Sequence, residues 1–236
     1  MIKIHLKIKA VLFDLDGTLT RYNLDYHLVK IKIVEDLNNH NQGKFKLEPS
    51  LTINAMFRSL KSNMPQEEFT KLLGRMNKVM EACELESVKR TELLPNTRIT
   101  LENLKDEGLR MAIVTNNGRA AAKKAILRFH LSSLIDFLIT REDVLFWKPD
   151  GAMVKEALCR LKVTSNEAVF VGDSTVDVLA ARNSNVLSIA IPSGPTKRGD
   201  LLDTAPDYML NSISDLSSLL NWLRIDTNRK DKKIGN

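Results

Sequence analysis

The sequence contains few of the residues that build cross-linked or zinc-dependent proteins. Its two cysteines, Cys83 and Cys159, lie far apart, and no two of its four histidines have metal-ligand spacing. We therefore expect neither a disulfide framework nor a zinc site. So few cysteines fit a reducing interior better than secretion.

Long apolar stretches are also missing. No run approaches the ~18 residues that a membrane-spanning helix needs. The first residues alternate apolar Ile2, Ile4, Leu6 and Ile8 with polar ones, which is typical of a strand and not of a signal peptide. We therefore expect a soluble, cytoplasmic protein with no membrane association.

A net excess of basic residues is missing from most of the chain, although the net charge of the whole chain is +6. Residues 1–10 and residues 224–236 each carry +3, so the rest is neutral by count. Charged termini of this kind are usually solvated and mobile. We therefore expect no nucleic-acid partner and a basic, flexible tail over 225–236.

The stretch AVLFDLDGT, residues 10–18, organises the rest of the sequence. It begins as a buried strand and ends in Asp14 and Asp16, which share one side because alternate residues of a strand do. Their charges repel, so a cation or a bound proton should offset them. A metal site, an acid/base pair, a nucleophile with its helper and a plain polar strand end all remain open here.

Residues 20–94 have the periodicity of helices and no strand pattern. Apolar residues recur every three or four positions in three stretches, which predicts three amphipathic helices. The apolar positions of the first stretch are Leu24, Leu28, Ile31, Val34 and Leu37. The second stretch runs from Ile53 to Leu60 and the third from Phe69 to Cys83.

From Pro95 onward strands and helices alternate. We expect strands at 109–114, 135–139, 168–171 and 186–191, and helices at about 97–107, 118–129, 150–161, 175–182 and 212–223. This alternation predicts an α/β fold, a Rossmann-like parallel sheet with helices on both faces. Residues 1–19 and 95–224 then form the core, and 20–94 form an inserted helical module, because a structureless loop that long is implausible.

The expected strand ends carry reactive side chains, and ligands of parallel sheets bind at that edge. In chain order these residues are Asp14, Asp16, Thr115, Asn116, Lys148, Asp173 and Asp177. Taken singly, each can be a helix cap, first-turn acid or solvated loop residue. Helix capping does not explain several carboxylates and one lysine at the same edge.

Phosphoryl transfer through an aspartyl phosphate needs such a set. One carboxylate attacks the phosphorus, and a second carboxyl group transfers a proton. Mg²⁺ favours oxygen ligands, and Asp14 and Asp173 suit it. Thr115 and Lys148 suit the phosphate oxygens and their charge.

Four segments resemble, in order and setting, the motifs of the haloacid dehalogenase (HAD) superfamily. They are DLDGT at 14–18, the strand ending in Thr115, Lys148 with Pro149, and GDSTVD at 172–177. The inserted helices resemble the C1-type cap of that superfamily, and the whole looks most like its phosphoglycolate phosphatase and β-phosphoglucomutase branch. The resemblance spans about residues 8–210.

The resemblance implies a role for each residue. Asp14 would be the nucleophile, and Asp16 the general acid/base whose backbone carbonyl also touches Mg²⁺. Thr115 and Lys148, with Asn116, would bind phosphate. Asp173 would be a metal ligand, supported by Asp177.

The implied activity is a Mg²⁺-dependent phosphatase that hydrolyses a small phosphorylated metabolite, as phosphoglycolate phosphatase does. A β-phosphoglucomutase-type phosphomutase is the alternative. A receiver-type phosphoacceptor fits less well, because its acceptor position here holds Thr140 and Arg141, and an inactive binding module would lack a nucleophile, acid or lysine. The residues at 180–185, AARNSN, depart from the Ala-Gly pair of many relatives.

The cap closes over the site in such proteins and selects the substrate. Arg21, Tyr22, Asn23, His27 and Arg58 are the candidates for contacts from that side. The sequence does not indicate which phosphate ester is the substrate, nor the oligomeric state.

Overall fold

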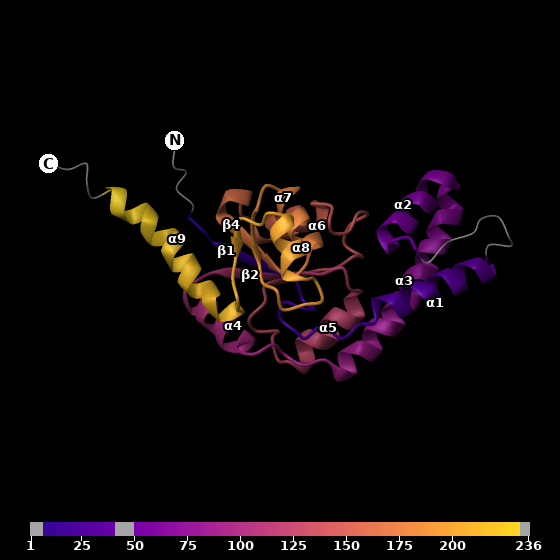
Figure 1. The fold of residues 1–236 in the computed structure, drawn as a ribbon, viewed down its shortest axis with the longest axis horizontal. Coiled ribbons are helices and arrows are strands. Elements are labelled where there is room, and N and C mark those ends of the chain that lie inside the picture. Colours follow the sequence, from indigo (N-terminus) through magenta and orange to yellow (C-terminus); the bar gives the residue numbers. More distant parts are fainter. Residues whose placement is uncertain (1–6, 41–49, 232–236) are drawn as a thin grey trace.

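The computed structural model describes residues 7–40 and 50–231. Three helices lie at one end, a sheet covered by helices forms the middle, and the last helix extends at the other end (Figure 1). The expected strand positions Ile2, Ile4 and Leu6 lie outside the described residues, whereas Ile8 is buried. No helix of the described part is both long and apolar enough to cross a bilayer.

The described residues form one parallel sheet of six strands in the order β3-β2-β1-β4-β5-β6. The strands are β1 (Ala10–Phe13), β2 (Arg110–Val114), β3 (Phe137–Ile139), β4 (Ala168–Gly172), β5 (Leu187–Ala190) and β6 (Tyr208–Met209). Phe13 at the end of β1 is level with Ile113 of β2 and Val171 of β4. The strand order reverses at β1, which is where ligands bind in open parallel sheets. The predicted α/β, Rossmann-like fold is confirmed.

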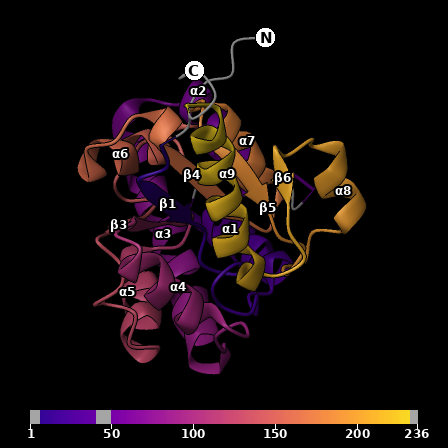
Figure 2. The ribbon, with the colours of Figure 1, turned by 90° about the vertical axis from the view of Figure 1, so that its left-hand side faces the viewer.

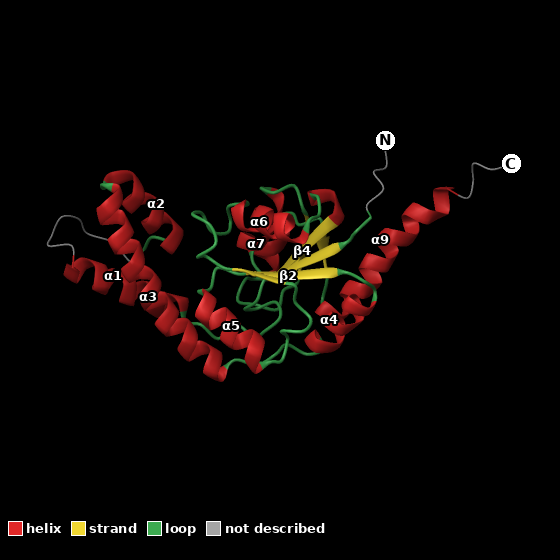
Figure 3. Cartoon of the chain, turned by 180° about the vertical axis from the view of Figure 1, so that it is seen from behind, coloured by secondary structure: helices red, strands yellow, loops and turns green. Residues whose placement is uncertain are grey.

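Helices cover both faces of the sheet because successive side chains of a strand point to opposite sides. Val11 and Phe13 pack in one apolar cluster with α4 (Thr97–Asp106), α5 (Arg119–Arg128) and α9 (Leu216–Asp231). Ala10 and Leu12 pack in the other with α6 (Ala152–Leu161) and α7 (Thr175–Arg182). Figure 3 shows the strands between these two layers. The short helix α8 (Arg198–Asp203) packs beside α7 at the β6 edge (Figure 2).

Residues 20–94, here called the cap, connect β1 to α4 through three helices, as expected. They are α1 (Tyr26–His40), α2 (Ile53–Asn63) and α3 (Gln66–Arg90). The chain leaves and re-enters the core through two paired segments, since the Arg21 N–H donates to the Glu92 carbonyl at 2.7 Å and the Leu94 N–H to the Leu19 carbonyl at 3.0 Å. This pairing lies at the expected boundaries, although the division into two domains remains a prediction.

The buried face of α1 differs from the expected one. The helix buries Val29, Ile33, Val34 and Leu37, whereas Leu28 is 45% exposed. Two apolar stripes at helical spacing overlap in this segment, so periodicity alone could not identify the face that packs on α3.

The C-terminal part of the core also differs from the expectation. The last helix continues to Asp231, into the segment 225–236, whose flexibility stays a prediction. We expected this helix to end at about residue 223, and Leu223 is buried in the core. Strand β6 and helix α8 were not expected, because two and six residues are too few to establish a period.

Candidate active site

A cavity of about 480 Å³ lies where β1, β2 and β4 end, between the sheet and the cap. All seven residues that the sequence predicted for the site line it. They come from separate parts of the chain, and the parallel sheet brings them together because the carboxyl ends of its strands meet at one edge.

Lys148 lies at the centre of this group and is 2% exposed. Its Nζ donates to Asp14 Oδ1 at 2.5 Å and to Asp177 Oδ1 at 2.6 Å. The Asn116 side chain holds the lysine backbone: its Nδ2 donates to the Lys148 carbonyl and its Oδ1 accepts from the Lys148 N–H, both at 3.1 Å. The Asn116 amide therefore positions Lys148, and a contact of Asn116 with phosphate stays a prediction.

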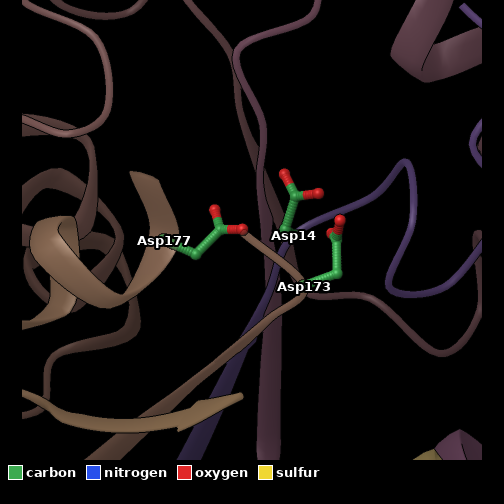
Figure 4. A group of neighbouring side chains, drawn as sticks. All are labelled: Asp14, Asp173 and Asp177. Carbon is green, nitrogen blue, oxygen red and sulfur yellow. The ribbon is translucent and has the colours of Figure 1, made fainter. Parts of the chain in front are cut away.

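Asp14, Asp173 and Asp177 form a buried acidic cluster. Each offers a carboxylate oxygen, and these oxygens lie within 4.8 Å of one another. Figure 4 shows the three side chains converging from the end of β1, the end of β4 and the first turn of α7. Asp177 also bonds with Ser174 to cap α7 and with Lys148, so Asp14 and Asp173 are the carboxylates best placed for a metal.

The electrostatics of the cluster favour a bound cation. Burial raises the pKa of Asp14 to about 7, although the Lys148 ammonium beside it acts in the opposite direction. Burial, with repulsion from Asp177 and Asp14, raises the pKa of Asp173 to about 8. Three carboxylates face one ammonium, and an all-oxygen set with excess negative charge suits a hard divalent ion.

Asp173 is fixed by the loop that follows β1. Thr18 Oγ1 donates to Asp173 Oδ1 at 2.9 Å. Gly17 has a φ of 100°, and a Cβ at that position would lie 2.4 Å from Asp173 Oδ2. Only glycine therefore permits both the turn and the approach of the carboxylate.

Asp16 stands apart from the cluster and is held by neutral groups. Its Oδ1 accepts from Thr20 Oγ1 and its Oδ2 from Asn117 Nδ2, both at 2.7 Å. Burial raises the pKa of Asp16, while these two hydrogen bonds oppose the rise. The carboxyl group is thus positioned at the cavity and is suited to hold a proton.

Thr115 follows β2 and is 2% exposed. Its Oγ1 accepts a hydrogen bond from the Asn117 N–H at 3.2 Å, which orients the hydroxyl at the wall of the cavity. A hydroxyl group that accepts in this way still has its own proton to donate to a ligand oxygen.

Comparison with known proteins agrees with this arrangement. The model of the haloacid dehalogenase-like hydrolases matches residues 11–191. The chain belongs to this family. It is therefore a hydrolase, and the family resemblance seen in its sequence motifs is confirmed.

Relatives and structures of this HAD-like hydrolase match it along most of its length. Pyrophosphatase PpaX of Bacillus velezensis is 29% identical over 211 residues, 89% of this chain and 95% of that protein. A Caldanaerobacter subterraneus protein that carries the same PpaX name is 30% identical, over 91% of this chain and 96% of its own. A predicted phosphatase from Clostridium acetobutylicum has the same fold, with a TM-score of 0.66, 22% identity and coverage of 91% and 99%.

Of the five cap candidates in this HAD-like hydrolase, Tyr22 alone lines the cavity. Arg21, Asn23, His27 and Arg58 are exposed and lie outside its lining. His27 on α1 and Arg58 on α2 are surface residues of amphipathic helices, and Arg21 and Asn23 lie in the exposed segment before α1.

A buried ion pair between the cap and the core was not predicted from the sequence. Glu84 on α3 pairs with the Arg141 guanidinium, and their side chains are 3% and 0% exposed. The second Glu84 oxygen accepts from the Gly118 N–H at 2.9 Å, and Arg141 also donates to the Asn116 carbonyl at 3.1 Å. The pair therefore connects the cap to the loop after β2 in this HAD-like hydrolase.

Glu84→Gln is expected to lower the free energy of unfolding by about 3 kcal/mol or more, because it leaves the Arg141 charge buried and unpaired. Denaturant unfolding measures the loss. The matched control is Glu86→Gln on the same helix, which removes an exposed pair with Lys89 and should cost under about 1 kcal/mol. Equal losses of unfolding free energy in the two variants would contradict a stabilising role for the buried pair of Glu84 and Arg141.

Proposed function

We propose that this hydrolase is a Mg²⁺-dependent phosphatase that acts on a small phosphorylated compound through an aspartyl phosphate on Asp14. The observation that carries the proposal is the setting of Asp14. Its carboxylate bonds with Lys148 and lies within 4.8 Å of the other acids of the cluster. Asp16, a protonatable neighbour, lines the same cavity.

The first step would transfer the phosphoryl group to the protein. A carboxylate oxygen of Asp14 attacks phosphorus, and the bond from phosphorus to the leaving oxygen breaks. Asp16 gives its proton to that oxygen, so the leaving group departs as a neutral alcohol. Thr115 and Lys148 donate to the phosphoryl oxygens as their charge develops.

The second step would hydrolyse the aspartyl phosphate and restore the free carboxylate of Asp14. Asp16, now ionised, takes a proton from water as the water oxygen attacks phosphorus, and the bond to the Asp14 oxygen breaks. Inorganic phosphate leaves, and Asp16 has regained the proton that it donated. The carboxyl group of Asp16, which Thr20 and Asn117 hold by hydrogen bonds, thus serves first as the acid and then as the base.

Asp14 and Asp173 would hold the ion, with the Asp16 backbone carbonyl as a further candidate ligand. Bound Mg²⁺ would offset the repulsion between the anionic nucleophile and the anionic phosphate. Asp177 supports the arrangement through Lys148 and Ser174.

Mg²⁺ is expected to stabilise the protein more at pH 8 than at pH 5.5. The pKa values of Asp14 and Asp173 are raised from 3.8 to about 7 and about 8, so the metal-free fold binds protons that the unfolded chain releases. The stability that proton binding by Asp14 and Asp173 contributes is complete below pH 4 and is lost as the pH rises through 7 and 8. Mg²⁺ binds the ionised carboxylates, so a 100-fold excess over Kd should raise Tm by about 5 °C or more at pH 8.

Melting curves with EDTA and with Mg²⁺ at both pH values measure this effect. Asp173→Asn should raise the metal-free Tm at pH 8, because it removes a repelling charge, and should reduce the response to Mg²⁺. Asp106→Asn, at an exposed carboxyl of α4, is the matched control and should keep the full response. An increase in Tm on adding Mg²⁺ that is the same at both pH values would contradict a metal site at Asp14 and Asp173.

The activity itself is tested by phosphate release from a panel of phosphorylated compounds with Mg²⁺. We expect turnover of at least one small ester, none with EDTA, and free phosphate as the product. The PpaX names of the relatives make inorganic pyrophosphate a second candidate substrate. Transfer of the phosphoryl group to a second sugar hydroxyl would instead indicate a mutase.

A further inference from the structure

The cap side of the cavity has a different chemistry from the core side. The core supplies the acids, Lys148 and Thr115, while the cap supplies mainly Leu24, Tyr26, Val29 and Met80. Tyr26 is 42% exposed at the start of α1, whereas Val29 and Met80 are nearly buried. A group bound on the phosphate therefore meets apolar and aromatic surface on the cap.

The charges around the cavity are strongly unequal. Among the described residues that line it, five are carboxylic acids and Lys148 is the single cation. Its ammonium already bonds with Asp14 and Asp177. Glu84 is the charged residue that the cap contributes to the lining, and its partner Arg141 lies outside the lining.

The cap is packed against the core in this structure, so these side chains form one wall of the cavity. The Phe57 ring on α2 has its centroid 5.4 Å from that of Trp147, the residue before Lys148. Lys61 Nζ lies 4.4 Å from the centroid of Phe146, and Lys61 is not among the residues that line the cavity. Glu84 and Arg141 join α3 to the core on the opposite side.

From these observations, and on the basis of the proposed function, we infer that the site selects phosphate monoesters whose leaving group is uncharged and partly apolar. A second anion on the leaving group would lie against Tyr26, Val29 and Glu84, where the described lining offers no cation to pair with it. Burying an unpaired charge is costly, and the acids of the site would add repulsion. Inorganic pyrophosphate and phosphorylated carboxylic acids would therefore be poor substrates.

Tyr22 adds a polar contact that does not change this preference. Burial raises its pKa to about 12, so its phenol remains neutral at physiological pH. A neutral phenol can donate to or accept from an uncharged hydroxyl or amide. The wall thus suits an alcohol or phenol with some hydrogen-bonding capacity.

Two substrates of equal size and different charge test the inference. They are 4-carbamoylphenyl phosphate and 4-carboxyphenyl phosphate. Pyrophosphate is assayed beside them. We expect kcat/KM for the amide to exceed that for the carboxylate by about 10- to 100-fold, within the range that a binding pocket achieves by contacts alone. Tyr26→Arg adds a cation to the wall and should reduce this ratio about tenfold, which corresponds to 1.4 kcal/mol. Leu28→Arg adds the same charge to an exposed position of α1 and should leave the ratio unchanged.

The change in ratio between variants is independent of the intrinsic reactivity of the two esters. Equal kcat/KM values for the two esters, or a pyrophosphate value as high as that for the amide, would overturn the inference and leave the phosphatase assignment standing. Equal effects of the two arginine variants would also overturn it. Lack of any hydrolysis, or full activity in an Asp14→Asn variant, would overturn the phosphatase assignment itself.

Discussion

Asp14→Asn is expected to reduce phosphate release from p-nitrophenyl phosphate by about 10⁴- to 10⁶-fold, the scale seen when a nucleophile is removed. The amide of asparagine cannot form the acyl phosphate. The fold should survive, because the substitution removes a buried charge and Lys148 keeps its bond with Asp177. Melting curves check the fold, and trapping of labelled phosphoprotein with acid checks the intermediate.

Asp16→Asn is the matched control for this result, since it makes the same change two residues away. It should slow turnover by about 10²- to 10⁴-fold through loss of proton transfer. The loss should be smaller for 4-nitrophenyl phosphate than for an alkyl phosphate. The 4-nitrophenolate ion is stable and leaves without being protonated, whereas an alkoxide needs a proton from Asp16. Equal losses in the two variants on every substrate would contradict the separate roles.

Lys148→Met should lower both turnover and stability, because it removes the cation that two buried carboxylates share. Loss of one preorganised charge contact typically costs about 10²- to 10³-fold in turnover. The variant should also be less stable by about 3 kcal/mol or more where Asp14 and Asp177 are both ionised. Raising the pH from 6 to 8 should increase that loss, since protonation of Asp14 relieves the repulsion at low pH.

Steady-state kinetics and denaturant unfolding at the two pH values measure these effects. Lys155→Met, at an exposed position on α6, controls for loss of a lysine and should change neither. Turnover within tenfold of the unchanged protein would remove Lys148 from the phosphate-binding role.

The buried strands and the polar residues at their ends could be predicted because each leaves a local pattern. An apolar run that stops at Asp14, or at Asp173, indicates both a strand and the edge at which it ends. The parallel sheet then brings these ends together without further information. The fold, and the clustering of Asp14, Thr115 and Asp173 at one edge of the sheet, were predictable for this reason.

Contacts between distant segments left no such pattern. Thr18 and Asp173 are separated by 155 residues, and nothing near either one predicts their hydrogen bond. Glu84 occupies an unremarkable position on an amphipathic helix, and its burial depends on where Arg141 lies. The two overlapping stripes of α1 likewise needed the packing of α3 to decide between them.

The contact between Phe57 and Trp147 provides an intrinsic optical probe of the cap. The chain has two tryptophans, of which Trp147 is 7% exposed and Trp222 on α9 is 55% exposed. A soluble quencher such as acrylamide should therefore remove the emission of Trp222 first. The remaining fluorescence would come from Trp147, which contacts α2 through Phe57 and directly precedes Lys148, and it would report any opening of the cap without an added label.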